Sequence, residues 1–221
     1  MSNTNQIKLS NSEITIAENQ FDIIPSCVHP IPLSFVNSNE YSRYMFCCLT
    51  TIHQNNLTLY RLPENFIVYL GDIIHENQII KPKGQMAFNI NAEDASRNGF
   101  IQQFQFKQPV HVVALDRVSN VKVLMANAIN EEKYDVVNAL ENNYSLKRID
   151  DKKTAIIMNK DPLSDFLILN YLCSLGYSGF ASKPLNGQPA RIYLCSSEQY
   201  LSFGKFSKYN DQFLTHTSQL T

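Results

Sequence analysis

The chain lacks the features that would place it in a membrane, secreted or well-known hydrolase class. None of its apolar runs approaches the roughly eighteen residues of a membrane-spanning helix, and the opening segment MSNTNQIKLSNSE has no apolar signal core. The sequence also contains no GxSxG, P-loop or HExxH motif. We therefore expect a chain that is cytoplasmic when made, with no nuclease or hydrolase motif and no membrane partner.

An excess of charge of either sign is missing as well. Lys and Arg together number 19 and Asp and Glu number 20, which gives a formal net charge of −1. Binding to nucleic acid or to an acidic membrane needs a basic surface, and the overall charge supplies none. We accordingly expect no nucleic-acid partner.

Cysteine and histidine are present without the spacing of a metal site. The sequence has no CxxC, and the five histidines do not cluster along it. An odd number of cysteines also argues against a disulfide framework, so we predict reduced thiols, no disulfides and no metal. These cysteines are Cys27, Cys47, Cys48, Cys173 and Cys195.

The composition that remains is that of a globular chain. Hydrophobic residues make up 44% of the 221 residues, enough for a sizeable core. Residues 1–12 are polar and read as an N-terminal arm, and we assign residues 13–221 to a single domain. Within it, residues 197–221 form an aromatic C-terminal segment that includes Phe203 and Phe213. We expect this segment to pack on the domain or, in preference, on a neighbouring chain.

Patterns of two and of 3.6 residues alternate along the chain and predict an α+β fold with flanking helices. We predict strands at 14–24, 57–62, 66–70, 85–90, 99–106, 109–116 and 192–195. We predict helices at 39–55, at 119–128 with a Ser119 or Asn120 cap, at 131–142, at 162–175 after the Asp161 cap, and short ones after Asn91 and from Ser197. Residues 26–38 and the charged run 143–160 are expected to be loops.

One stretch carries a resemblance to a known family. Residues 66–95, FIVYLGDIIHENQIIKPKGQMAFNINAEDA, follow the order strand, glycine, loop with a proline, strand and asparagine-capped helix. This order resembles the nicotinamide-binding half of the ADP-ribosyltransferase fold, and the resemblance implies mixed, mainly antiparallel sheets with flanking helices. In the branch with a His-Tyr-Glu triad the first strand ends in Tyr-His-Gly, where this chain has Tyr69, Leu70 and Gly71. The next strand there begins Phe-Phe-Ser-Thr, where this chain has Ala87, Phe88 and Asn89.

The resemblance extends to residues 165–201, DFLILNYLCSLGYSGFASKPLNGQPARIYLCSSEQYL. This segment is similar to proteins of large DNA viruses that share the fold and have a strand of the form Glu-Ile-x-Leu-Cys, whose Glu is the catalytic carboxylate. The matching residue here is Arg191, and a guanidinium cannot act as that carboxylate. Glu198, seven residues later, is the nearby acid that an enzyme would have to use.

A second branch of the family, with an Arg-Ser-Glu triad, offers another alignment. The strand LTLYRL, residues 57–62, resembles its opening strand, in which the arginine orients the cofactor, and this would be Arg61. The hydroxyl residues that open the next strand of that branch are absent between Ala87 and Ile90.

The resemblance therefore implies two functions. In the first, the chain is a non-catalytic structural or interaction protein on a degenerate ADP-ribosyltransferase-like scaffold, needs no cofactor, binds protein partners or itself, and is a component of a virion or other assembly. The substitutions at Leu70, Asn89 and Arg191 favour this hypothesis. In the alternative, the chain is an NAD-dependent ADP-ribosyltransferase that modifies a protein or nucleic acid, with catalytic Glu198 and with NAD bound by Arg61, Tyr69, Gly71 and Phe88.

Overall fold

The structure is a computed structural model that describes residues 49–73, 79–90, 92–95, 100–150, 153–159, 161–182 and 190–208. Its strands are β1 (Thr50–Gln54), β2 (Leu57–Leu62), β3 (Ile67–Ile73), β4 (Met86–Asn89), β5 (Phe100–Phe106), β6 (Val110–Ala114), β7 (Tyr144–Arg148), β8 (Thr154–Met158), β9 (Gly179–Ser182), β10 (Arg191–Leu194) and β11 (Leu201–Lys208). Its helices are α2 (Ala92–Ala95), α3 (Val118–Asn130), α4 (Tyr134–Asn143), α5 (Pro162–Ser174) and α6 (Ser197–Tyr200). The predicted α+β class with mainly antiparallel sheets and flanking helices is confirmed.

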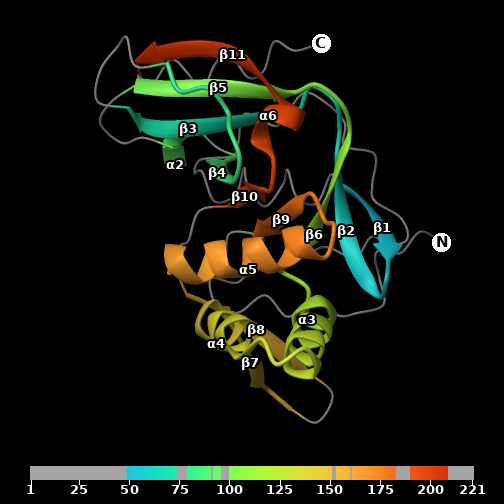
Figure 1. The fold of residues 1–221 in the computed structure, drawn as a ribbon. Coiled ribbons are helices and arrows are strands. Elements are labelled where there is room, and N and C mark those ends of the chain that lie inside the picture. Colours follow the sequence, from blue (N-terminus) through green and yellow to red (C-terminus); the bar gives the residue numbers. More distant parts are fainter. Residues whose placement is uncertain are drawn as a thin grey trace, which may run out of the picture.

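Nine of the described strands form one sheet in the order β1-β2-β6-β9-β10-β4-β3-β5-β11. Only β6 and β9 pair in parallel among them, and the remaining two strands, β7 and β8, form a separate hairpin. The strands β3, β5 and β11 run across the top of Figure 1, whereas β1 and β2 run downward on its right-hand side. The sheet is therefore strongly twisted along its length.

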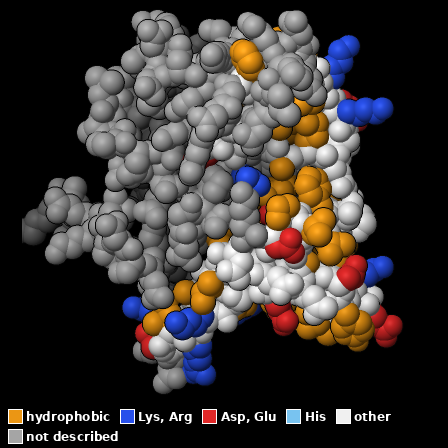
Figure 2. Space-filling model, turned by 90° about the vertical axis from the view of Figure 1, so that its left-hand side faces the viewer, with side chains coloured by type: hydrophobic (Ala, Val, Ile, Leu, Met, Phe, Trp, Pro, Cys, Tyr) orange, Lys and Arg blue, Asp and Glu red, His pale blue; other side chains and the backbone are white. Residues whose placement is uncertain are grey.

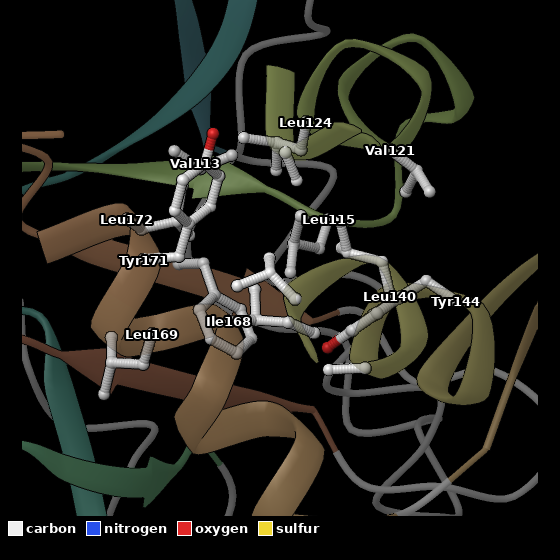
Figure 3. Close-up of a cluster of buried hydrophobic side chains, with 14 of the residues drawn as sticks. Val113, Leu115, Val121, Leu124, Leu140, Tyr144, Ile168, Leu169, Tyr171 and Leu172 are labelled. Carbon is white, nitrogen blue, oxygen red and sulfur yellow. The ribbon is translucent and has the colours of Figure 1, made fainter. Parts of the chain in front are cut away.

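The twisted sheet separates the two larger of three hydrophobic clusters among the described residues, and we call these two the cores. On one face α3, α4 and α5 pack against strand residues such as Leu59, Val113 and Phe180, and Figure 3 shows their side chains gathered around Leu115, Leu140 and Ile168. The residues next to these strand residues, Tyr60 and Val112, face the other core. That second core also takes Val68, Phe104 and Phe106, from strands at the far end of the sheet order, so the sheet curls around it.

Hydrogen bonds explain where several elements begin. The Asp161 carboxylate accepts from the N–H groups of Leu163 and Ser164 at 3.2 and 3.3 Å, which confirms the predicted cap of α5. The predicted cap of α3 is wrong, because Arg117 holds that position and Asn120 is fully buried. The Asn120 amide instead donates to the carbonyls of Thr58 and Ala114, at 2.7 and 2.8 Å, and so ties α3 to two strands.

Other predicted elements need correction. The charged run 143–160 contains the β7–β8 hairpin, because one side of it packs against α3 and α4 and enters the helical core through Tyr144 and Met158. Residues 50–54 are strand rather than the end of a helix, since they pair with β2, and β3 continues past Leu70 to Ile73. Residues 201–208 form β11 on β5, so this part of the aromatic segment packs on its own chain. The predictions for residues 1–48, including the polar arm, lie outside the described residues, as does the cap Asn91.

The prediction of no disulfide is wrong. Cys173, near the end of α5, is bonded to Cys195, directly after β10, and their Cα atoms lie 5.7 Å apart. The two residues are 22 positions apart in the sequence, and only the packing of α5 over the sheet brings them together. Cys27, Cys47 and Cys48 lie outside the described residues.

Candidate functional site

Four polar side chains lie in a row across four neighbouring strands. Tyr69 of β3 is opposite Asn89 of β4, Asn89 is opposite Arg191 of β10, and Arg191 is opposite Ser182 of β9. Directly opposed residues share one face of a sheet, and here it is the face on which α5 packs over β9 and α2 packs over β3 and β4. We call these four residues the polar row.

The polar row contains unsatisfied polar atoms. Asn89 Oδ1 and Arg191 Nε are both buried and have no hydrogen-bond partner among the described residues. A buried donor and acceptor without partners cost free energy, so native structures rarely keep them without a reason. Because these two atoms belong to directly opposed residues, the polar row stands out from the apolar strands around it.

Behind the polar row, the Asp165 carboxylate of α5 accepts hydrogen bonds from three side chains. The Tyr193 hydroxyl donates to its Oδ2 at 2.5 Å, and the Asn143 amide and the Tyr144 hydroxyl donate to its Oδ1 at 2.8 and 3.2 Å. Asp165 is only 6% exposed. One buried carboxylate thus joins α5 to the sheet, to the end of α4 and to the start of β7.

The electrostatics of this cluster are set mainly by burial. Burial raises the pKa of Asp165 above its ordinary 3.8, while the three hydrogen bonds and the charge of Arg191 act in the opposite direction. Burial and the neighbouring Asp165 carboxylate raise the pKa values of the Tyr193 and Tyr144 hydroxyls. At neutral pH both tyrosines are therefore protonated donors to Asp165, and neither is a base or a nucleophile.

The sequence-derived candidates are distributed over both faces and both ends of the sheet. Tyr69 is in the polar row, but Phe88 is fully buried on the opposite face of the sheet. There its ring packs edge-on against the ring of Phe104, with the two ring centroids 5.4 Å apart. Leu70 also packs toward that opposite core, and Gly71 lies in the irregular part of β3 between Leu70 and Ile73. Leu70 and Arg191 therefore lie on different faces of the sheet.

Arg61 is far from the polar row. It is exposed on β2 and pairs with His111 of β6. His111 comes two residues before Val113 on β6, and Val113 pairs with Phe180 of β9. Ser182 of the polar row is two residues beyond Phe180 on β9, which runs parallel to β6. The structure thus places Arg61 toward the opposite end of the strands from Arg191.

Glu198 has a local role in the structure. Its exposed carboxylate accepts a hydrogen bond from the Gly84 N–H at 2.6 Å, and the Ser197 N–H donates to the Gly84 carbonyl at 2.9 Å. The pair of bonds fixes the turn that leads into β4, and Gly84 suits this turn because its φ is +62°. Glu198 is on α6, beyond the end of β10, and thus outside the polar row.

Sequence reasoning did not single out Asp165, Asn143 or Tyr144. One signal was available for Asp165, which is a charged residue inside the apolar run LSDFLILNYL, where an acid with no partner would be costly. No comparable signal marks Asn143 or Tyr144. Within the described residues, no three His, Cys, Asp or Glu side chains stand together as metal ligands would. No helix there has both the length and the apolar content to cross a membrane.

Comparisons with protein-family models, with curated proteins and with solved structures found no match for this chain. The similarity to ADP-ribosyltransferases therefore stays a prediction from the sequence.

Proposed function

We propose that this chain is a non-catalytic structural or interaction protein on a degenerate ADP-ribosyltransferase-like scaffold. The observation that carries the proposal is the position of Arg191, the residue that the resemblance aligns with the catalytic carboxylate. It lies in the polar row opposite Asn89, with its Nε buried, where a base or a carboxylate that stabilises an oxocarbenium ion would be needed.

The neighbouring acids support the same conclusion. Asp165 is almost completely buried and already accepts three hydrogen bonds, so its lone pairs are committed to holding the fold together. Glu198 is occupied by the backbone of Gly84. Neither carboxylate is placed to take the part of the missing one beside Asn89.

Exposed apolar side chains favour a protein partner or self-assembly. Leu163 and Leu167, one turn apart on α5, are 77% and 39% exposed, and Tyr134 of α4 is 61% exposed. Figure 2 shows hydrophobic side chains along the described part of one face, with acidic and basic ones between them. Clusters of exposed apolar residues are typical of protein interaction surfaces.

The alternative, an NAD-dependent ADP-ribosyltransferase, is tested directly by titrating the purified chain with NAD under calorimetry and by assaying released nicotinamide. We expect no saturable heat and no nicotinamide above the spontaneous rate. Saturable binding with nicotinamide release that Arg191→Gln or Glu198→Gln abolishes would overturn the proposal. Sedimentation of the same sample reports whether the chain associates with itself.

A restored pair serves as the matched control. Tyr69→His with Arg191→Glu places the missing groups on the same face, at the two positions that flank Asn89. Leu70→His with Arg191→Glu makes the same chemical change with the histidine on the opposite face. Because the resemblance places the family's histidine at Leu70, a gain in NAD binding in the second double variant would support that alignment, whereas a gain in the first alone would place the histidine position at Tyr69.

A further inference from the structure

The contact between α5 and β10 is closed at two points. Toward the start of the helix, the Asp165 carboxylate accepts the 2.5 Å hydrogen bond from Tyr193. Toward its end, Cys173 is bonded to Cys195, which directly follows the strand. We call the contact between these two points the α5–β10 seam.

The helix is held in place without the disulfide. Ile168, Leu169 and Leu172 are fully buried in the core beneath it, and Figure 3 shows Ile168 directed toward α4. The Asp161 cap and the Asp165 cluster fix its first turns. Burial of three large aliphatic side chains stabilises the docked helix by several kcal/mol, about 1.5 to 3 for each, so a chain with two thiols should stay folded.

The disulfide lies at the margin of this core. Both cysteines are half-buried, and Leu175 and Gly176, which follow the helix, are exposed. The Gln85 amide, at the entrance to β4, donates to Asn170 Oδ1 at 2.6 Å and lies 3.7 Å from Cys173 Sγ. The Gln85 side chain just before β4, the end of α5 and the residue after β10 therefore meet at this bond.

We propose that Cys173 and Cys195 form a redox-responsive clamp of the α5–β10 seam. In the reduced chain both thiols are free, the helix stays docked through its first turns, and the cysteine end of the seam opens. In an oxidising environment the clamp closes and fixes the end of β10, the strand that carries Arg191 and Tyr193.

The closing step is a thiol–disulfide exchange with a small disulfide such as oxidised glutathione. The thiolate of one cysteine attacks a glutathione sulfur, the glutathione disulfide bond breaks, and one glutathione thiolate leaves. The second cysteine thiolate then attacks the mixed disulfide, releases the second glutathione and forms the Cys173–Cys195 bond. Two protein thiols are oxidised, one glutathione disulfide is reduced to two thiols, and the two thiol protons pass to the glutathiones.

The test uses the full chain with Cys27, Cys47 and Cys48 replaced by Ser, so that only the proposed pair remains. The chain is equilibrated in glutathione buffers of varied oxidised-to-reduced ratio, its free thiols are counted by alkylation and mass spectrometry, and amide hydrogen exchange is measured. We expect reversible interconversion and intact far-UV circular dichroism in both states. Exchange in the reduced chain should be at least about tenfold faster around residues 173–178 and 194–196, and unchanged around residues 165–169.

Thermal denaturation gives a second readout. Closing a loop of 22 residues by a disulfide restricts the unfolded chain, so reduction should lower the melting temperature by about 5 to 10 °C. Cys173→Ser with Cys195→Ser should behave like the reduced chain at every buffer ratio.

Three results would overturn the proposal. The first is that the two thiols never pair at any glutathione ratio. The second is that reduction unfolds the whole chain, which would make the bond a permanent structural one. The third is that hydrogen exchange around residues 173–178 is the same in both redox states.

Discussion

At the scale of the residue, Asp165 connects more of the fold than any other side chain described above. It brings together Tyr193 from the sheet, Asn143 from the end of α4 and Tyr144 from β7. A buried carboxylate is tolerated when several donors surround it, and the loss of one donor leaves a charge that is less well compensated. The contribution of each donor can therefore be measured by removing its hydroxyl or amide alone.

Replacing Tyr193 by Phe removes the hydroxyl that donates to Asp165 and keeps the ring that stacks on Phe180 at 4.4 Å. Because the acceptor is a buried carboxylate, we expect the free energy of unfolding to fall by about 1.5 to 3 kcal/mol in urea denaturation. Tyr200→Phe is the matched control, since its hydroxyl donates to the neutral Ser178 hydroxyl at 3.0 Å, and it should cost about 1 kcal/mol. An equal decrease in the free energy of unfolding for Tyr193→Phe and Tyr200→Phe would contradict the conclusion that Tyr193 donates to a charged carboxylate at Asp165.

At the scale of the element, the N-cap and the first turn of α5 each have an aspartate, and the pKa values of these two aspartates are shifted in opposite directions. Hydrogen bonds from the Ser164 hydroxyl and from the N–H groups of the first turn lower the pKa of Asp161 below 3.8. Burial raises the pKa of Asp165 above the same value. The sequence predicted the first role, because an acid before a proline is typical of a helix N-cap. It could not predict the second, because the partners of Asp165 come from α4, β7 and β10.

The two aspartates should therefore respond to pH in opposite directions, which urea midpoints from about pH 7 to about pH 3 can show. Above about pH 4 the free energy of unfolding of the wild type should exceed that of Asp161→Ala, and the difference should disappear as the pH falls through the lowered pKa of Asp161. Relative to Asp165→Asn, the wild type becomes more stable as the pH falls through the raised pKa toward 3.8, because the folded chain binds the proton first. Parallel pH profiles for the two comparisons would refute the assignment.

At the scale of the whole molecule, one sheet separates two cores and both depend on it. Leu140 is fully buried in the core under α3, α4 and α5, and Leu62 is fully buried in the core on the opposite face. Neighbouring residues of the same strands enter different cores, as Leu59 and Tyr60 do. Disrupting either core therefore removes support from strands that the other core needs, and we expect the described part of the chain to unfold as one unit.

Leu140→Ala and Leu62→Ala test this cooperativity. Each substitution should lower the free energy of unfolding by about 2 to 5 kcal/mol, and far-UV and near-UV circular dichroism should follow one shared urea transition. Leu163→Ala, at a position that is 77% exposed, is the control and should change stability by no more than about 0.5 kcal/mol. Two separate transitions, each shifted by only one of the core substitutions, would show that the cores unfold independently.

The sequence by itself determined the elements whose signals are local. The alternation in β5, the continuous apolar run of β6 and the Asp161-Pro162 start of α5 were sufficient, because side-chain pattern and capping act within a few residues. The β7–β8 hairpin was missed, since its charged residues concealed a side that is buried only when α3 and α4 pack on it. Only the tertiary structure decided the polar row, the three donors of Asp165, the Cys173–Cys195 bond and the placement of Leu70 and Arg191 on different faces. The physical reason is that strand order, register and helix packing bring together residues that are distant in the sequence.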